Sequence, residues 1–386
     1  MTYNLQYIRK SGNSTTINRI KKSYFIKKRL ECTCYDQAYV LPINQDMKGG
    51  VVDRNLNEIK ASPIQQIKGQ YSFETNQIRK EKSAILLATF TTYTWGHCFT
   101  DHFSKLWFLQ TEQCKKLIED GATLIYISIN NKKPPQYVCD LFMLAGVNLS
   151  NARCVENITQ YDYLYIPDDS FFSGIEKEPR FFTKEYRDII EAVRKNVYSS
   201  NKNLNIQLFP KIYLTRTQGR NFSSMYRDLG EKVLDKVFKR LGYQIIAPEK
   251  LTVNEQIWLL MNCKEVVTTE GSIAHTAVFC NQGTNIVLIK KCNWISMHQL
   301  VVNEVAKLNV TYIDAHHSCF CDKKEPWHGP FFMCITKELQ NYAGHRILHI
   351  PYFLSHSFFI YCAREIYVKS FRKIQWIDKY TRKFLK

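Results

Sequence analysis

The chain has 386 residues, of which 45% are hydrophobic, and a formal net charge of +18. This length and apolar content are enough for two domains with hydrophobic cores of their own, and they exclude a largely disordered protein. The charge is concentrated at the ends, since residues 1–31 and 345–386 each carry a net +7, together 14 of the 18 charges. Because the middle of the chain is nearly balanced, we expect no nucleic-acid partner bound along the whole protein.

The basic ends also contain many aromatic residues, which suits the anionic inner surface of a membrane, where each nearby Lys or Arg contributes about 1 kcal/mol. A solvated tail or an ordinary core helix with a charged outer face is the alternative. No run of about 20 apolar residues and no signal peptide is recognisable. The thirteen scattered cysteines fit thiols in a reducing compartment. We therefore expect a cytoplasmic protein that is peripheral on the inner face of the membrane.

Apolar runs alternate with helical patterns along the first half of the chain. Strands are predicted at 83–90 (SAILLATF), 123–129 (TLIYISI) and 161–167 (YDYLYIP), and helical patterns follow the first two. Such alternation predicts a parallel sheet that is covered on both faces.

The segment 95–107 (WGHCFTDHFSKLW) combines aromatic and ionisable residues at helical spacing. On one continuous helix, His97, Asp101 and Lys105 would share a face, and the aromatic side chains would lie on the other. We expect the aromatic face to be buried and the His97–Asp101 face to line a cleft. The alternative is a buried, hydrogen-bonded pair with only a structural role.

An Asn- and Ser-rich stretch at 195–210 ends in proline and is the predicted domain boundary. A second series of strands and helices follows it, at 211–216, 226–243, 244–248, 252–263, 265–272, 273–281 and 284–290. Thr252 and Glu255 have the spacing of a capping box. Two parallel α/β domains would place a ligand cleft at the carboxyl ends of their strands.

Two features of the second series suit an anion. Gly271 and Ser272 start a helix directly after a strand, where backbone N–H groups and the helix dipole can bind a phosphate. Arg216 closes a predicted strand and Arg220 follows it, and guanidinium groups bind phosphate in a bidentate manner. Two ordinary surface arginines are the alternative.

The order of several motifs resembles that of the bacterial branch of glycosyltransferase family 61, which includes capsule and lipopolysaccharide glycosyltransferases. The resemblance covers about residues 38–290, and the motifs are GGVVD, WGHCFTDHFSKLW, IYLTRTQGR, the segment 230–267 and EGSIAHTAVF. It implies a GT-B architecture, in which two Rossmann-like domains face each other across a cleft and a C-terminal helical tail crosses back. It also implies a nucleotide-sugar donor, inversion at the anomeric carbon, and no obligatory metal or other cofactor.

With this resemblance, residues 1–200 are expected to form the acceptor-side domain with its basic arm. Residues 205–335 would form the nucleotide-sugar-binding domain, and residues 336–386 the basic aromatic tail.

The motifs of the family fall on particular residues of this chain. Its GHxxxD motif falls on Gly96, His97 and Asp101, its two arginines on Arg216 and Arg220, its Glu-Gln pair on Glu255 and Gln256, and its GSxxH motif on Gly271, Ser272 and His275. The chain departs from the family at Thr276, where Asn is usual, and at Leu288, where Glu is frequent.

The chemistry of inverting transfer suits these residue types. A base must take the proton of the acceptor hydroxyl, and positive groups must stabilise the departing diphosphate. Asp101 or His97 would be the base; we favour Asp101, with His97 orienting it, although the reverse order resembles a catalytic triad. The arginines and the turn at Gly271 would hold the diphosphate. Hydroxyl groups of the donor would contact Glu255, Glu270 and His275, and Lys105 would be solvated.

Other interpretations of the sequence are weaker. The segment 316–321 (HHSCFC) contains zinc-ligand residue types with His328 nearby, but no second ligand pair at structural spacing is evident, so we expect no metal. The leading prediction is a glycosyltransferase that acts on a glycan or lipid-linked acceptor. The alternatives are a nucleotide-sugar epimerase and a non-enzymatic protein that binds anions or membranes.

Overall fold

The computed structural model divides the chain into two compact units, Ser23–Leu204 and Met1–Lys22 with Asn205–Lys386. It describes residues 1–9, 18–60, 67, 69–74, 78–172, 174, 180–200, 206–218, 228–317, 329, 331–344, 366–367, 370 and 373. Both units are mixtures of helices and strands with parallel pairing, so the predicted α/β class is confirmed.

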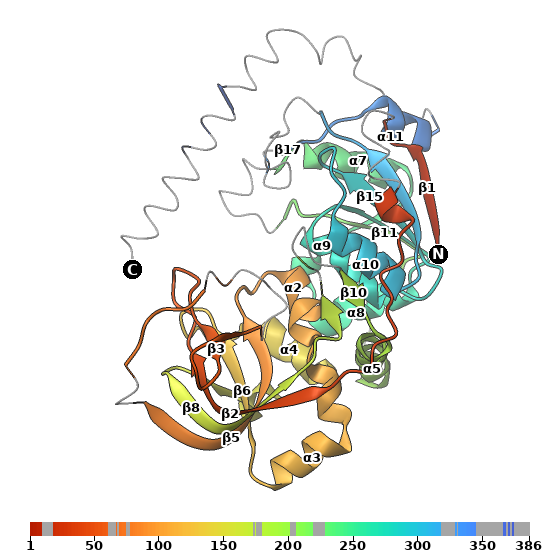
Figure 1. Ribbon diagram of the computed structural model, residues 1–386. Helices are drawn as coiled ribbons and strands as arrows, with labels where there is room; N and C mark the ends of the chain where they lie inside the picture. The colour runs from red at the N-terminus through yellow and green to blue at the C-terminus, as the bar shows by residue number, and fades with distance from the viewer. Residues whose placement is uncertain are drawn as a thin grey trace. The chain divides into compact units, whose positions relative to one another are not determined.

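The Ser23–Leu204 unit contains a seven-stranded mixed sheet (Figure 1). Its order is β4-β3-β2-β8-β5-β6-β7, with bounds β2 (Cys32–Leu41), β3 (Gly50–Val52), β4 (Glu58–Ile59), β5 (Arg79–Phe90), β6 (Thr123–Ser128), β7 (Arg153–Cys154) and β8 (Thr159–Pro167). The strands from β8 to β7 pair in parallel, as predicted. The strands β2, β3 and β4 pair in the antiparallel direction and extend the sheet on the other side of β8.

Short helices and one long helix complete this unit. They are α2 (Trp95–Phe99), η2 (Asp101–Phe103), η3 (Leu106–Gln110), α3 (Glu112–Glu119), α4 (Gln136–Leu144), η4 (Leu149–Asn151) and α5 (Lys184–Ser200), and a small pair joins β9 (Phe171–Phe172) to β10 (Phe181–Phe182). The prediction of one continuous helix over 95–107 is wrong. The chain leaves the helical conformation at Thr100, whose hydroxyl donates to the carbonyl of Gly96 at 2.8 Å. Such back-bonding bends helices.

The other unit is built on a six-stranded sheet in which all neighbours are parallel. Its order is β1-β16-β15-β14-β11-β13, with bounds β1 (Thr2–Tyr7), β11 (Lys211–Leu214), β13 (Gln244–Ile246), β14 (Glu265–Thr269), β15 (Asn285–Lys290) and β16 (Asn309–Asp314). From β13 to β16 this is the order 2-1-3-4-5 of a doubly wound sheet. Ligands of such sheets bind outside the carboxyl ends of the strands, where the order reverses, which here is between β11 and β14.

Helices connect the strands of this sheet. They are α7 (Glu231–Arg240), η6 (Pro248–Lys250), α8 (Val253–Asn262), α9 (Ser272–His275), η7 (Thr276–Phe279), α10 (Met297–Val305) and α11 (Lys337–Tyr342), and a short pair joins β12 (Asp228–Leu229) to β17 (Phe331–Phe332). The predicted capping box is confirmed, because the Thr252 and Glu255 side chains cap α8 reciprocally.

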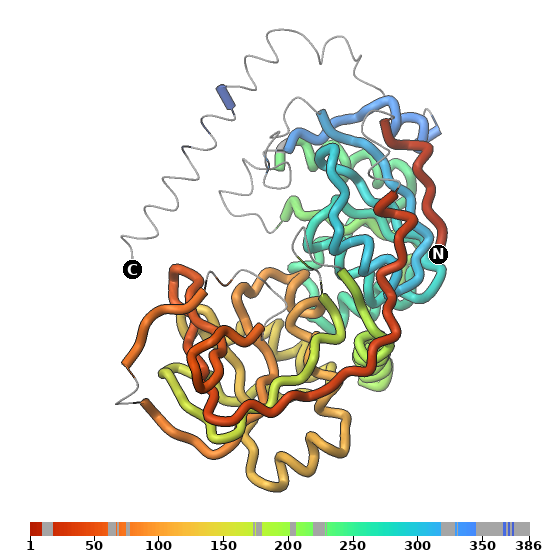
Figure 2. Tube along the Cα trace, viewed as in Figure 1, coloured from red at the N-terminus to blue at the C-terminus, as the bar shows by residue number. Residues whose placement is uncertain are grey.

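The first strand, which the sequence grouped with residues 1–200, belongs to this sheet. Strand β1 pairs with β16, and Figure 2 shows the red N-terminal strand beside segments of the C-terminal half. Most of the expected tail at 336–386 lies outside the described residues. In the described part of the chain, no helix combines the length and the apolar character needed to span a bilayer.

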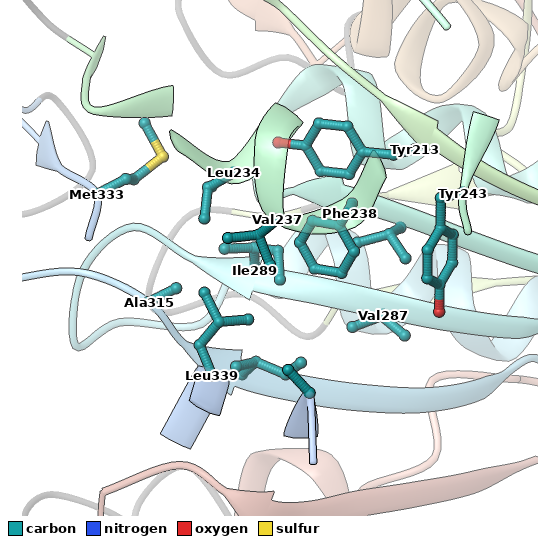
Figure 3. Packing of buried hydrophobic residues seen from close by; sticks show 13 residues of the cluster. Tyr213, Leu234, Val237, Phe238, Tyr243, Val287, Ile289, Ala315, Met333 and Leu339 are labelled. Atoms are coloured by element: carbon teal, nitrogen blue, oxygen red, sulfur yellow. The ribbon is translucent and has the colours of Figure 1, made fainter. Parts of the chain in front are cut away.

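One hydrophobic core of this unit packs α7 against the sheet (Figure 3). Leu234, Val237 and Phe238 follow the i, i+3, i+4 spacing of a helix face, and the Phe238 ring stacks on Tyr213 of β11 at 4.9 Å. Helix α7 begins after Gly230, which has φ of 80° and lies so close to another backbone carbonyl that a Cβ atom would come within 2.0 Å of it. Only glycine fits there, and this contact fixes the start of the helix.

Candidate functional site

The structure brings His97 and Asp101 together within the Ser23–Leu204 unit. The Nδ1 atom of His97, on α2, lies 2.5 Å from Oδ2 of Asp101, the first residue of η2, and the Thr100 hydroxyl donates to the same oxygen at 3.2 Å. The two side chains differ in exposure: that of Asp101 is 0% exposed and that of His97 is 26% exposed. Thus the imidazole is the more accessible of the two groups, and the carboxylate lies behind it.

The carboxylate changes the protonation of the imidazole. Burial lowers the pKa of His97, but the hydrogen bond to Asp101 and the negative charge of that carboxylate raise it by more, so that the net shift is upward. In the neutral ring, an N–H group at Nδ1 donates a hydrogen bond to the Asp101 carboxylate, and Nε2 is left unprotonated as the basic nitrogen. The pair can therefore accept a proton at Nε2 and stabilise the resulting positive charge.

Lys105 does not share a face with this pair. Its side chain is 3% exposed, and its ammonium donates to the Asp169 carboxylate at 2.6 Å and to the carbonyl of Pro167 at 2.8 Å. The expectation of a solvated lysine is therefore wrong. Because the helix is interrupted at Thr100, the following residues turn inward and Lys105 anchors the segment after β8.

Cationic groups gather where the parallel sheet of the other unit reverses its order. Arg216 follows β11 and Gly271 follows β14, the two strands on either side of the reversal. A Cβ atom at Gly271 would lie 3.6 Å from Nζ of Lys291 and 3.8 Å from a guanidinium nitrogen of Arg216. Both cations thus lie close to the backbone at Gly271, whose φ of 132° favours glycine, and this geometry suits an anion.

The same two cations flank a buried carboxylate. Asp228, which is 2% exposed, has one oxygen 3.9 Å from the Arg216 guanidinium and the other 3.6 Å from Lys291 Nζ. The Lys291 ammonium also lies 4.4 Å from the centre of the Phe331 ring. Sequence reasoning missed Lys291. The available signal was its position directly after a buried strand, since the carboxyl ends of parallel strands meet at one edge of a sheet.

Glu270 is buried beside this group. Burial raises the pKa of its carboxyl to about 7, against the opposing influence of Lys290, of a backbone N–H and of Lys291. The N–H comes from Ser296, the N-cap of α10, at 3.4 Å. Glu270 thus links the end of β14 to the start of α10.

The remaining predicted donor residues have structural contacts of their own. The Glu255 carboxylate accepts from the backbone N–H of Thr252 at 2.7 Å within the capping box, and Gln256 donates to the carbonyl of Leu251 at 3.2 Å. His275 is buried and hydrogen-bonds through Nδ1 to the Gln299 amide at 2.8 Å. Ser272 is the partly exposed first residue of α9. Arg220 lies outside the described residues.

The segment considered for zinc is only partly described. His316 is buried, and both of its ring nitrogens have partners at 3.0 Å, the carbonyl of Lys290 and the Asn293 amide oxygen. Burial lowers the pKa of His316 to about 3. The low pKa keeps the ring neutral, and because protein groups engage both of its nitrogens, His316 is a core histidine. Of the other candidate ligands, His317 is buried with its ring against Phe332, and Cys319, Cys321 and His328 lie outside the described residues.

One comparison with known proteins identifies the family of the chain. The family model Glycosyltransferase 61 matches residues 95–287, half of the chain, and this segment includes the His97–Asp101 pair, Arg216 and Gly271. Among solved structures, the chain is similar to the bacterial iron-containing dodecameric glycosyltransferase TibC from enterotoxigenic E.coli H10407. The two are 12% identical, the match covers 67% of this chain and 74% of TibC, and the TM-score is 0.26, which does not establish a common fold. No curated protein sequence matches the chain.

Proposed function

Because the chain belongs to glycosyltransferase family 61, we propose that it is an inverting, metal-independent enzyme that transfers a sugar from a nucleotide donor to a glycan or lipid-linked acceptor. The order of its motifs supports a place in the biosynthesis of surface polysaccharides such as capsule or lipopolysaccharide. The proposal includes a GT-B architecture, with the acceptor bound by the Ser23–Leu204 unit, the donor by residues 205–335 and a tail at 336–386. The basic, aromatic ends support a peripheral position on the inner face of a membrane.

The proposal depends above all on the hydrogen-bonded His97–Asp101 pair inside the matched segment. A general base must come within about 2.6–3.2 Å of the proton that it removes. The Asp101 side chain is fully buried and already accepts two hydrogen bonds, whereas the imidazole is partly exposed. We therefore assign the base to His97 and the orienting role to Asp101, the reverse of the order favoured from the sequence.

In the proposed reaction, Nε2 of His97 takes the proton of the acceptor hydroxyl. The oxygen uses the freed electron pair to form a bond with the anomeric carbon, while the bond from that carbon to the diphosphate oxygen breaks. The leaving nucleoside diphosphate keeps the electron pair of the broken bond. Asp101 fixes the tautomer that leaves Nε2 basic and stabilises the imidazolium that forms.

The leaving diphosphate is proposed to bind beside Gly271, with Arg216 and Lys291 as its cationic partners. Both cations lie close to the Gly271 backbone, at the reversal of strand order where doubly wound sheets bind ligands. Positive groups held in place before the reaction stabilise developing negative charge without having to reorganise. We keep Ser272, Gln256 and Arg220 as proposed donor contacts. We propose that Glu255, Glu270 and His275 support the donor site indirectly, since Glu255 caps α8, Glu270 joins the end of β14 to α10, and His275 joins α9 to α10.

The experiment that tests this proposal separates donor binding from turnover. A thermal-shift screen over nucleotide sugars first identifies the donor, because a ligand of the native state raises the unfolding midpoint. With that donor, His97→Ala is expected to lose about 10²–10⁴-fold in turnover and to bind the donor as well as the wild type does. Arg216→Ala is expected to lose donor binding.

Lys116→Ala, on the exposed side of α3, is the matched control and should keep both properties. Full turnover by His97→Ala would exclude the proposed base. A wild-type protein that binds no nucleotide sugar would exclude the proposed donor class.

A further inference from the structure

A pocket of about 350 Å³ lies in the Ser23–Leu204 unit, and neither His97 nor Asp101 lines it. It is lined by Arg79 at the start of β5, Tyr126 of β6, Asn131 and Lys133 of the following loop, and residues of the segment 152–159. Its volume is within the range of small-molecule sites, about 300–1,000 Å³. The lining is rich in charged and amide side chains, which indicates a polar ligand.

Two guanidinium groups at this pocket are held by one carboxylate. Glu81, whose side chain is only 16% exposed, forms an ion pair with Arg79 through one oxygen, 2.7 Å from Nε, and accepts a hydrogen bond from Arg153 through the other. Arg153 also donates to the hydroxyl of Tyr161 at 3.0 Å. The two hydrogen bonds restrict the motion of Arg153, so less conformational entropy is lost when it binds a ligand, whereas the Arg79 side chain is 58% exposed and is held by the ion pair alone.

The pocket carries a positive charge. Arg79, Arg153 and Lys133 contribute three cations, against the carboxylates of Glu156 in the lining and of Glu81 behind it. The exposed Lys133 lies at the rim. This charge favours an anionic ligand, and the planar guanidinium groups match the oxygens of a carboxylate or a phosphate.

The loop that brings Asn131 to the rim has a defined conformation. Asn130 and Asn131 both have left-handed backbones, with φ of 51° and 54°, and their N–H groups donate to the carbonyls of Ile43 at 2.7 Å and Ser128 at 3.2 Å. The side-chain amide of Asn131 donates to the carbonyl of Glu156 at 3.0 Å, across the lining of the pocket. Asparagine tolerates this conformation better than most residues. The rim is therefore built by specific contacts, and it offers an amide group for hydrogen bonds to hydroxyls.

We infer that this pocket binds an anionic unit of the acceptor glycan, a sugar ring that carries a carboxylate or a phosphate group. The arginines and Lys133 bind the charged group, and amides bind the ring hydroxyls. The assignment to the acceptor rests on the proposed function, whereas the chemistry of the ligand follows from the pocket itself. The donor diphosphate is assigned to other residues, Arg216 and Lys291, so the two sites can be tested separately.

The test measures binding of small saccharides to the full chain by isothermal titration calorimetry in the absence of any donor. Glucuronate and glucose 6-phosphate represent the two sources of charge, and glucose and inorganic phosphate are the uncharged and sugar-free probes. At least one of the two anionic sugars is expected to bind at least about tenfold more tightly than either probe, a difference of 1.4 kcal/mol. Its affinity should fall as salt increases.

Two charge reversals on neighbouring exposed lysines locate the binding. Lys133→Glu is expected to weaken binding of the anionic sugar by about tenfold or more, because it places a negative charge in the lining. Lys132→Glu makes the same change of charge at a side chain outside the lining and should leave the affinity within about twofold. Arg216→Ala should also leave it unchanged.

Three results would overturn the inference: neither anionic sugar binds, glucose or inorganic phosphate binds as tightly as they do, or the two lysine variants behave alike. A failure of the proposed function would look different. In that case the wild-type protein would not bind a nucleotide sugar or transfer its sugar, while saccharide binding and its loss in Lys133→Glu would persist.

Discussion

Replacing Glu270 by glutamine should stabilise the protein at alkaline pH. Glu270 is 6% exposed at the end of β14, and burial raises the pKa of its carboxyl from 4.5 to about 7. The Glu270→Gln side chain has nearly the same shape as the protonated acid and can still accept the hydrogen bond from the Ser296 N–H. The substitution therefore removes the ionisation and keeps the packing.

The magnitude follows from the two pKa values. Between about pH 4.5 and pH 7 the unfolded chain releases the proton of Glu270 while the folded chain retains it, so the wild-type protein loses stability as pH rises through this window. At 1.36 kcal/mol per pKa unit, the total loss is about 3 kcal/mol and is nearly complete at pH 8. The variant lacks this loss. The difference in unfolding free energy between the variant and the wild type should therefore increase by about 2 kcal/mol, in favour of the variant, between pH 5 and pH 8.

The assay is urea unfolding of both proteins, followed by tryptophan fluorescence at pH 5 and at pH 8. Glu249→Gln, at an exposed position of η6, is the control and should differ from the wild type by less than about 0.5 kcal/mol at either pH. If the difference in unfolding free energy between Glu270→Gln and the wild type does not change with pH, Glu270 has an ordinary pKa and the reasoning is refuted. A more stable wild type at pH 8 would show that Lys290 and Lys291 outweigh the cost of burial.

Three further predictions concern other parts of the chain. If His97 is the base, its raised pKa should place the rising limb of the pH profile of kcat/KM, which reports the free enzyme, above pH 6.5, and a limb at or below that value would contradict the assignment. Lys105→Met removes one partner of a buried ion pair and should lower the unfolding free energy by about 3 kcal/mol in urea titrations; an unchanged midpoint would contradict this. Gly230→Ala should cost more than about 2 kcal/mol, because its Cβ would meet the carbonyl of Met333, whereas Gly242→Ala, with a similar φ but open space, should cost about 1 kcal/mol; equal losses of thermal stability would refute the steric argument.

Features that depend on neighbouring residues could be predicted from the sequence. The strands at 123–129 and 161–167 correspond to β6 and β8, because a short apolar run between polar segments favours a buried strand wherever it packs. The capping box of Thr252 and Glu255 was correct because it involves a single turn of chain. The same holds for the contact between His97 and Asp101, which are four residues apart.

Features that depend on distant residues were missed or mistaken. The pairing of β1 with β16 joins residues about 300 positions apart, and no local pattern indicates it. The spacing of Lys105 from Asp101 suggested a shared face, but a hydrogen bond at Thr100 interrupts the helix and Asp169 binds the ammonium group. Lys291 approaches Gly271 because β14 and β15 are parallel neighbours, a relation that only the assembled sheet provides.

The sequence by itself determined the alternation of strands and helices, the local caps, and the chemical types of the groups that stand at the ends of strands. Only the tertiary structure decided which member of the His97–Asp101 pair is accessible, which lysine joins Arg216, and that Glu270 is cut off from water. The physical reason is that exposure and charge environment are set by the atoms that pack around a group, and most of those atoms come from segments far away in the chain.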